Sequence, residues 1–182
     1  EPLILERRRI YPSAQLILIG HSMGGLFARY YAECLDARRF TSRVITIGTP
    51  YQGTVKALCA LANGHARLSA GPFAVTVEIG DLVRTLPSVA ELLPVYPCIG
   101  SDLDSLAEIS PSTIVPGLPE FVRDHALGFH RKIARAVAGN GVDRPAYSPI
   151  LGHRQPTPHR ASVGELGVEA WSPSEIHLRG DG

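Results

Sequence analysis

The sequence has 182 residues, of which 45% are hydrophobic and 19% are charged. This length and composition predict a single folded domain with room for a small subdomain, and they exclude a disordered chain. Lys and Arg number 18 and Asp and Glu number 17, which leaves a formal net charge of +1. A chain with so little net charge has no strong positive electrostatic potential to attract nucleic acid, and we expect no nucleic-acid partner.

A strand, a helix and a second strand are predicted near the start of the chain. Residues 15–20 (QLILIG) form a short apolar run typical of a strand that is buried on both faces of a parallel sheet. Apolar side chains at helical spacing from Leu26 to Leu35 indicate an amphipathic helix, with Glu33 off its apolar face. Residues 43–48 (RVITIG) repeat the buried-strand pattern. Strand, helix and strand in this order predict a parallel βαβ unit.

The rest of the chain contains a proline-broken segment and a regular helix. Residues 56–117 are apolar and are interrupted by six prolines, which favours a mostly helical insertion of short elements. Residues 118–137 have helical periodicity, and the side chains expected to face the core include Phe121, Val122, His125, Phe129 and Ile133. Residues 148–152 are a candidate third strand of the sheet.

One motif points to covalent chemistry. Residues 20–24 read G-H-S-M-G, which matches G-x-S-x-G, and they lie where the predicted strand turns into the predicted helix. This context predicts that Ser22 stands in a strained turn as a nucleophile, while the glycines let strand and helix approach closely. The N–H of Met23, at the start of the helix, would donate to the oxyanion of a tetrahedral intermediate. The alternative is a glycine-rich turn that holds a phosphate or no ligand.

Longer segments resemble a known family. Residues 20–26 (GHSMGGL), followed by A-R-Y-Y, resemble the nucleophile elbow of α/β-hydrolase lipases, and residues 44–54 (VITIGTPYQGT) resemble their next strand and loop. Residues 87–94 resemble the lid region of the lecithin:cholesterol acyltransferase-like lipases and acyltransferases, and the closing G-D-G at 180–182 resembles their catalytic-acid segment. The resemblance implies a truncated α/β-hydrolase fold, with a parallel sheet, flanking helices and a mostly helical lid insertion.

The same resemblance implies domains and site residues. It assigns residues 1–55 and 118–182 to the hydrolase core and residues 56–117 to a lid or cap. Ser22 would be the nucleophile and Asp181 the acid of a catalytic triad. The residues implied to contact substrate are His21, Thr49, Pro50, Leu92 and Leu93.

The base of the triad does not occur where the resemblance places it. The chain order in this fold is serine, acid, histidine, and only one residue follows Asp181. We therefore expect the base, and the upstream loop that gives a second oxyanion donor, to lie outside this chain, with residues 1–10 ending a preceding helix. A base at His153 or His159 would need an earlier acid such as Asp143. For the 182 residues alone we expect little or no turnover.

The predicted function is that of a serine-nucleophile lipase, esterase or O-acyltransferase that acts on lipid acyl esters through an acyl-enzyme. The alternative is a catalytically inactive fragment or binding module of the same fold. We expect a lipid or acyl-ester substrate, transient contact with a membrane surface, and neither cofactor nor metal.

The sequence also bears on compartment and on cysteine chemistry. No signal peptide or membrane span is recognised, and the cytoplasm is the default compartment for a chain whose N-terminus is expected to be incomplete. The sequence predicts no oligomeric state. Cys34, Cys59 and Cys98 are expected to be small buried side chains, with a Cys59–Cys98 disulfide left open.

Overall fold

The computed structural model describes residues 2–70, 73–78, 80–100, 105–141, 144–153, 157–165 and 167–171. The chain folds as two compact units. The first consists of Glu1–Thr49 and Ile133–Leu151, and the second consists of Pro50–Lys132 and the chain from Gly152 onward. Each unit is described by itself.

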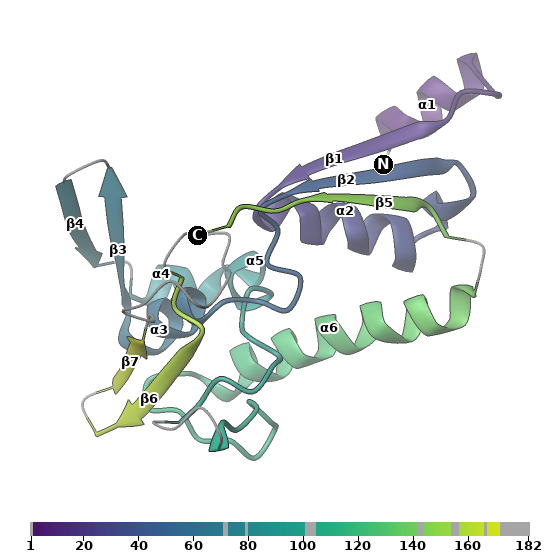
Figure 1. Cartoon of the computed structure of the whole chain (residues 1–182). Coiled ribbons are helices and arrows are strands. Elements are labelled where there is room, and N and C mark those ends of the chain that lie inside the picture. The colour runs from purple at the N-terminus through teal and green to yellow at the C-terminus, as the bar shows by residue number, and fades with distance from the viewer. Residues whose placement is uncertain are drawn as a thin grey trace. The chain divides into compact units, whose positions relative to one another are not determined.

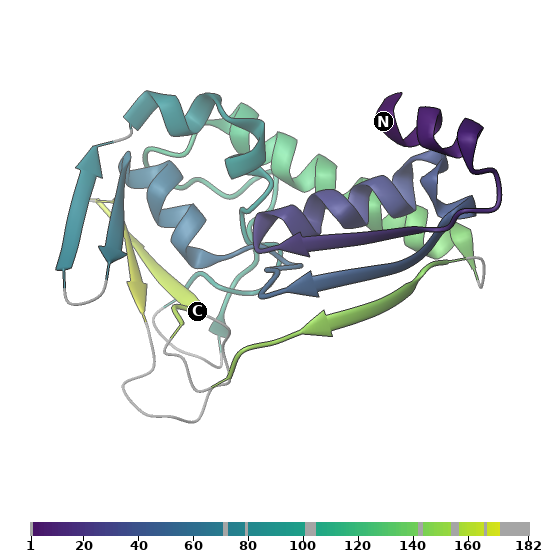
Figure 2. The ribbon, with the colours of Figure 1, turned by 90° about the horizontal axis from the view of Figure 1, so that it is seen from above.

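The first unit is an α/β structure built on a three-stranded parallel sheet (Figures 1 and 2). Its strands lie in the order β1-β2-β5, which confirms both the βαβ unit and the third strand. In chain order its elements are α1 (Pro2–Ile10), β1 (Leu16–His21), α2 (Met23–Cys34), the 3-10 helix η1 (Asp36–Arg39), β2 (Thr41–Ile47), the end of α6 (Glu120–Asn140) and β5 (Ala146–Ile150).

The two faces of this sheet differ in burial. Alternate residues of a strand point to opposite faces. Val44 and Thr46 of β2 are buried, and α2 runs along one face of the sheet (Figure 1). Large apolar side chains of the other face are exposed, among them Ile17, Ile19, Ile47 and Ile150. The expectation that β1 is buried on both faces is therefore wrong for the described structure, because helices cover only one of its faces.

The second unit contains the larger hydrophobic core. Its elements are α3 (Val55–Asn63), the antiparallel pair β3 (His65–Ala70) and β4 (Phe73–Glu78), α4 (Gly80–Thr85), α5 (Pro87–Ala90), most of α6, and the antiparallel pair β6 (Arg160–Gly164) and β7 (Gly167–Trp171). The core includes Leu58, Leu61, Leu93, Cys98 and Val122. The expected helices of residues 56–117 are present, accompanied by the β3–β4 pair.

The compact units do not share the predicted domain boundaries. Residues 56–117, predicted as a lid, fold together with the start of α6 and with the β6–β7 pair. The reason is that α3, α6 and β6–β7 all contribute side chains to one core. The lid role of residues 56–117 stays a prediction.

The three cysteines are free thiols, so the Cys59–Cys98 disulfide is not formed in this structure. Cys98 is buried as expected, whereas Cys34 and Cys59 are only half-buried. Burial raises the pKa of Cys59 to about 11. Burial, together with the nearby Cys59 and Glu108, raises the pKa of Cys98 to about 12. Both thiols therefore stay protonated near neutral pH, as expected of structural cysteines.

Helix α6 buries most of the face that its periodicity predicted, since Val122, Phe129 and Ile133 are buried. Two side chains expected on that face are not buried. Phe121 and His125 are exposed.

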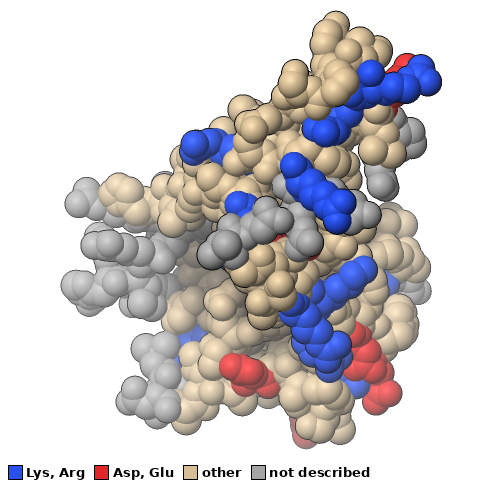
Figure 3. Space-filling model, turned by 90° about the vertical axis from the view of Figure 1, so that its right-hand side faces the viewer, with Lys and Arg blue, Asp and Glu red and all other residues tan. Residues whose placement is uncertain are grey.

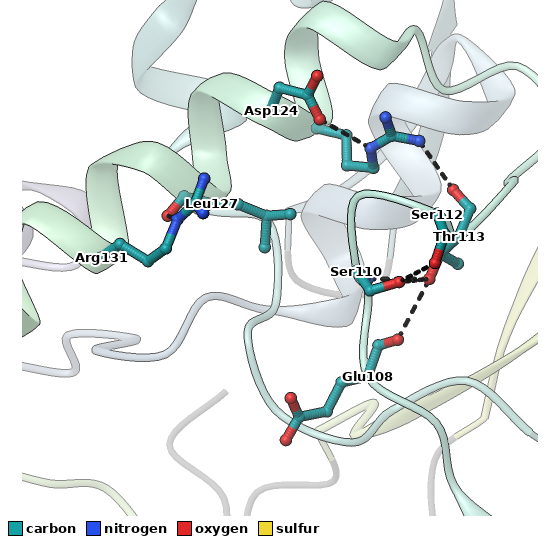
Figure 4. Close-up of polar contacts among 8 residues, drawn as sticks. Glu108, Ser110, Ser112, Thr113, Asp124, Leu127 and Arg131 are labelled. Atoms are coloured by element: carbon teal, nitrogen blue, oxygen red, sulfur yellow. Dashed lines mark hydrogen bonds and ion pairs between the residues drawn. The ribbon is translucent and has the colours of Figure 1, made fainter.

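On the same helix, the charged residue Arg123 is buried. The guanidinium of Arg123 donates to the Thr113 carbonyl oxygen at 3.0 Å and to Asp124 Oδ1 at 3.0 Å (Figure 4). These bonds compensate the burial of its charge.

Figure 3 shows one face of the molecule, on which Lys and Arg side chains occur in separate groups with Asp and Glu among them. None of the helices that the structure describes has the length and apolar character needed to cross a membrane. Across the described ranges, no cluster of three or more His, Cys, Asp or Glu side chains could hold a metal ion.

Candidate active site

Ser22 connects strand β1 to helix α2 through a strained backbone conformation. Its φ is 52° and its ψ is −127°, and among the described residues it is the only non-glycine with a positive φ. Such a conformation costs on the order of 1–3 kcal/mol and persists only where the surrounding structure enforces it. The strained strand-to-helix turn predicted for residues 20–24 is therefore present.

Two glycines make this turn possible because their neighbours leave no room for a side chain. A Cβ at Gly20 would lie 2.6 Å from the backbone carbonyl carbon of Gly24. A Cβ at Gly25 would overlap Oγ1 of Thr49 and lie 2.7 Å from its Cγ2. Gly24, by contrast, has open space where its Cβ would be, so the expectation that this motif glycine permits close approach is wrong. Close approach, rather than backbone freedom, is thus what requires glycine at positions 20 and 25.

Hydrogen bonds from neighbouring segments hold the Ser22 backbone on both sides. The Ser22 N–H donates to the Ile47 carbonyl oxygen at 2.8 Å, at the end of β2. The Ser22 carbonyl oxygen accepts from the Gly25 N–H at 3.0 Å and from the Thr49 hydroxyl at 3.0 Å. The turn is therefore fixed by the chain on either side of it and by the segment after β2.

The electrostatic setting of Ser22 favours negative charge. Ser22 precedes the first residue of α2, where backbone N–H groups carry the positive end of the helix dipole. Met23, as that first residue, has an N–H without an intrahelical acceptor. The half-buried Ser22 forms no side-chain hydrogen bond with any described residue. A hydroxyl in this position can approach a ligand while nearby N–H groups face developing charge.

The residues predicted to contact substrate differ in their accessibility. In the first unit, His21 is exposed and lies beside Ile47 in the sheet register. Thr49 is 4% exposed, and its hydroxyl is directed at the Ser22 carbonyl. In the second unit, Pro50 and Leu92 are half-buried, whereas Leu93 is fully buried in the hydrophobic core.

The loop after β2 and the segment around Leu92 are brought together within the second unit. The Thr54 N–H donates to the Leu92 carbonyl oxygen at 2.8 Å, and the Val95 N–H donates to the Gln52 carbonyl oxygen at 2.9 Å. Pro50 belongs to this loop, and Leu92 and Leu93 belong to the segment that it contacts. Three of the predicted substrate residues therefore lie in two segments that are hydrogen-bonded to each other. Their contact with substrate stays a prediction.

The structure describes only some of the residues predicted as the acid or as an alternative base of the triad. Asp181 and Asp143 lie outside the described residues. His153 is exposed, whereas the ring nitrogens of His159 are buried. Burial and the neighbouring charge of Arg160 lower the pKa of His159, which keeps the imidazole neutral near pH 7.

The sequence analysis missed a buried carboxylate at the other end of α2. The Glu33 side chain is 0% exposed. Its Oε1 accepts from Arg144 Nη2 at 2.7 Å and from the Tyr147 hydroxyl at 2.8 Å, and its Oε2 accepts from Asn140 Nδ2 at 3.0 Å. Glu33 therefore lies inside the unit, not off the apolar face of α2 as expected.

The network explains the ionisation of its members. Burial alone raises the pKa of Glu33, but hydrogen bonds from its three partners and the charge of Arg144 outweigh burial, and the pKa is lowered. Burial and the bond to Glu33 raise the pKa of Tyr147. Glu33 is thus a carboxylate and Tyr147 a neutral donor near pH 7. No local sequence signal connects residues that are 111 positions apart.

Comparison with known proteins agrees with the resemblance carried by the motif. The family described as lecithin:cholesterol acyltransferase has a sequence model that matches residues 3–113. Because this match covers more than half of the chain, the protein belongs to the lecithin:cholesterol acyltransferase family.

Among solved structures, a chain in the crystal structure of the Tle4–Tli4 complex is similar at 19% sequence identity, with a TM-score of 0.46. The alignment covers 68% of this chain and 34% of that chain, so this chain spans about a third of the length of its relative. No curated protein matches the chain.

Proposed function

We propose that this chain carries the nucleophile of a lipase, esterase or O-acyltransferase with the α/β-hydrolase fold, and that Ser22 forms an acyl-enzyme with a lipid acyl ester. The observation that most supports the proposal is the positive φ of Ser22 between β1 and α2. Strained residues of this kind concentrate at active sites, and G-x-S-x-G at a strand-to-helix turn is the arrangement of a nucleophile elbow.

The proposed chemistry begins with attack of Ser22 Oγ on the ester carbonyl carbon. The serine proton passes to a general base, and the carbonyl electron pair moves to oxygen, where the Met23 N–H donates a hydrogen bond. Collapse of this intermediate breaks the ester bond, and the departing alcohol takes the proton from the base. Transfer of the acyl group to water then gives a carboxylic acid, and transfer to an alcohol gives a new ester.

The remaining roles keep the assignments that the sequence predicts. Asp181 is the proposed acid, and the base is proposed to be a histidine outside this chain. The family description names an acyltransferase for lecithin and cholesterol, which supports a lipid acyl ester as the substrate class here. His21, Pro50 and Leu92 are the accessible candidates for substrate contact, since His21 is exposed and the other two are half-buried.

Acylation can be tested without turnover. Because the base is proposed to lie outside these residues, we expect acylation to be slow. Long incubation with p-nitrophenyl octanoate leaves a small yield of octanoyl adduct on the peptide that contains Ser22, detected by mass spectrometry, and Ser22→Ala removes it. Ser13→Ala is the matched control, because Ser13 is an exposed serine in a turn of the same unit. An adduct of equal yield in Ser22→Ala would refute the proposal. Absence of any adduct in the unmodified chain would favour the alternative of a non-catalytic module.

A further inference from the structure

Thr49 makes a contact that distinguishes it from a substrate-binding side chain. Its hydroxyl donates to the carbonyl oxygen of Ser22 at 3.0 Å, and the residue is 4% exposed. Its side chain also fills the space that a Cβ at Gly25 would occupy. Both residues belong to the first unit, and Thr49 follows the end of β2 by two positions.

The accepted hydrogen bond acts on the peptide group that links Ser22 to Met23. A peptide group is planar, so its C=O and N–H point in opposite directions along one rigid unit. A donor that holds the Ser22 carbonyl therefore also fixes the direction of the Met23 N–H, the proposed oxyanion donor. Hydrogen bonding at the carbonyl also polarises the same peptide and strengthens its N–H as a donor.

The Gly25 N–H shares this carbonyl, but it cannot replace Thr49. That bond comes from within the first turn of α2 and moves with the helix. The Thr49 bond comes from the segment after β2, and it holds the peptide against the sheet. The strained φ of Ser22 requires such an external restraint.

We propose that Thr49 is a positioning residue, whose hydroxyl orients the Ser22–Met23 peptide so that the Met23 N–H faces the oxyanion. The proposal rests on the function proposed for Ser22, and it replaces substrate contact as the role of Thr49. The hydroxyl acts through the peptide and touches no reacting atom.

Thr41, the first residue of β2, provides a matched control. It is also 4% exposed, and its hydroxyl donates to the Ala37 carbonyl oxygen at 2.8 Å. Thr41→Val and Thr49→Val each remove one buried threonine-to-carbonyl bond, one at the start of β2 and one two residues after its end. A purely structural role for Thr49 would make the two variants alike in every measurement.

The first measurement is a magnetic resonance spectrum of the full chain labelled with ¹⁵N-methionine. Because Met23 is the only methionine of the sequence, its amide gives one assigned signal. We expect Thr49→Val to shift this signal, and Thr49→Ser and Thr41→Val to leave it near its original position. An unmoved Met23 signal in folded Thr49→Val would overturn the positioning role, whatever the activity of Ser22.

The second measurement is the rate at which a fluorophosphonate modifies Ser22. We expect Thr49→Val to slow this reaction by about tenfold, less than the roughly hundredfold cost of a reacting group misplaced by about 1 Å, and we expect Thr49→Ser to restore the rate. Equal rates in Thr49→Val and Thr41→Val would also overturn the proposal. Absence of modification in the unmodified chain would refute the function of Ser22, while the Met23 signal would still report on the position of the peptide.

Discussion

The two ends of helix α2 are built on opposite principles. At its N-terminal end, Ser22 has a strained backbone and a hydroxyl without a described partner. At its C-terminal end, the Glu33 carboxylate is buried and accepts hydrogen bonds from three side chains. We call the Ser22 end of α2 its open end, because the backbone is strained and the hydroxyl has no described partner. We call the Glu33 end its closed end, because the carboxylate is buried and fully hydrogen-bonded.

The difference shows how a fold accommodates a strained residue. A buried carboxylate with good partners ties α2 to β5 and to the end of α6, which anchors the helix away from the turn. The glycine contacts and the Thr49 bond then set the geometry of the turn itself. We infer that the C-terminal end of α2 contributes mainly to stability and that its N-terminal end contributes mainly to reactivity. Each of the following predictions tests this division.

The largest expected effect is on stability and comes from the closed end. Arg144→Met would leave the buried Glu33 carboxylate without its cationic partner, and breaking a buried pair in this way costs about 3–5 kcal/mol in the free energy of unfolding. Urea unfolding measures this loss. Arg43→Met is the control, because the Arg43 bond to Ser148 is exposed and its removal should cost less than about 1 kcal/mol. Equal losses in both variants would show that Glu33 does not anchor α2.

A smaller loss is expected at the open end from Gly25→Ala. The added Cβ would overlap the Thr49 side chain, and overpacking of this kind typically costs about 1–3 kcal/mol. Gly24→Ala is the matched control, since open space surrounds that position and alanine is favoured by about 1 kcal/mol over glycine inside a helix. Unfolding curves in which the two variants coincide would contradict the close-approach explanation.

Ser22→Gly should raise the free energy of unfolding by about 1 kcal/mol, because glycine adopts a positive φ without the strain that serine carries. The same substitution should abolish covalent modification. Ser22→Ala should also abolish modification without the gain in stability, since alanine keeps the strain. If Ser22→Gly lowered stability relative to Ser22→Ala, the turn would not be strained in the way that its φ indicates.

The smallest effect is confined to acid pH. The pKa of Glu33 is lowered in the folded chain, so its network stabilises the fold above the unfolded pKa of about 4.5 and loses this contribution as pH falls through the folded pKa. We expect the difference in melting temperature between the unmodified chain and Glu33→Gln to shrink as pH is lowered from 7 to 3. A constant difference across this range would mean that Glu33 is not ionised in the fold.

Local patterns in the sequence predicted most of the first unit. The apolar runs around residues 15–20 and 43–48 and the helical spacing between them depend on neighbouring residues, and the βαβ unit that they define is present. The G-x-S-x-G motif likewise predicted the strained turn and the close approach at Gly20, because its sequence and its strand-to-helix position are local features. It did not distinguish Gly24, which has open space, from Gly25, which has none.

Features that depend on distant partners were not predictable in this way. The burial of Glu33 depends on Arg144 and Tyr147, which lie more than 100 positions away. On α6, periodicity correctly predicted a buried face that includes Val122, but it did not predict the burial of Arg123, whose guanidinium donates to the Thr113 carbonyl oxygen. Likewise, the sequence placed Thr49 near the site, but only the structure shows its hydroxyl on the Ser22 carbonyl.

The most direct test of the proposed nucleophile is activity-based labelling of the chain with a fluorophosphonate, followed by mass spectrometry of the peptides. We expect the label on the peptide that contains Ser22, its loss in Ser22→Ala, and its retention in Ser13→Ala. Label distributed over other serines, or equal labelling in Ser22→Ala, would contradict the assignment of Ser22 as the nucleophile.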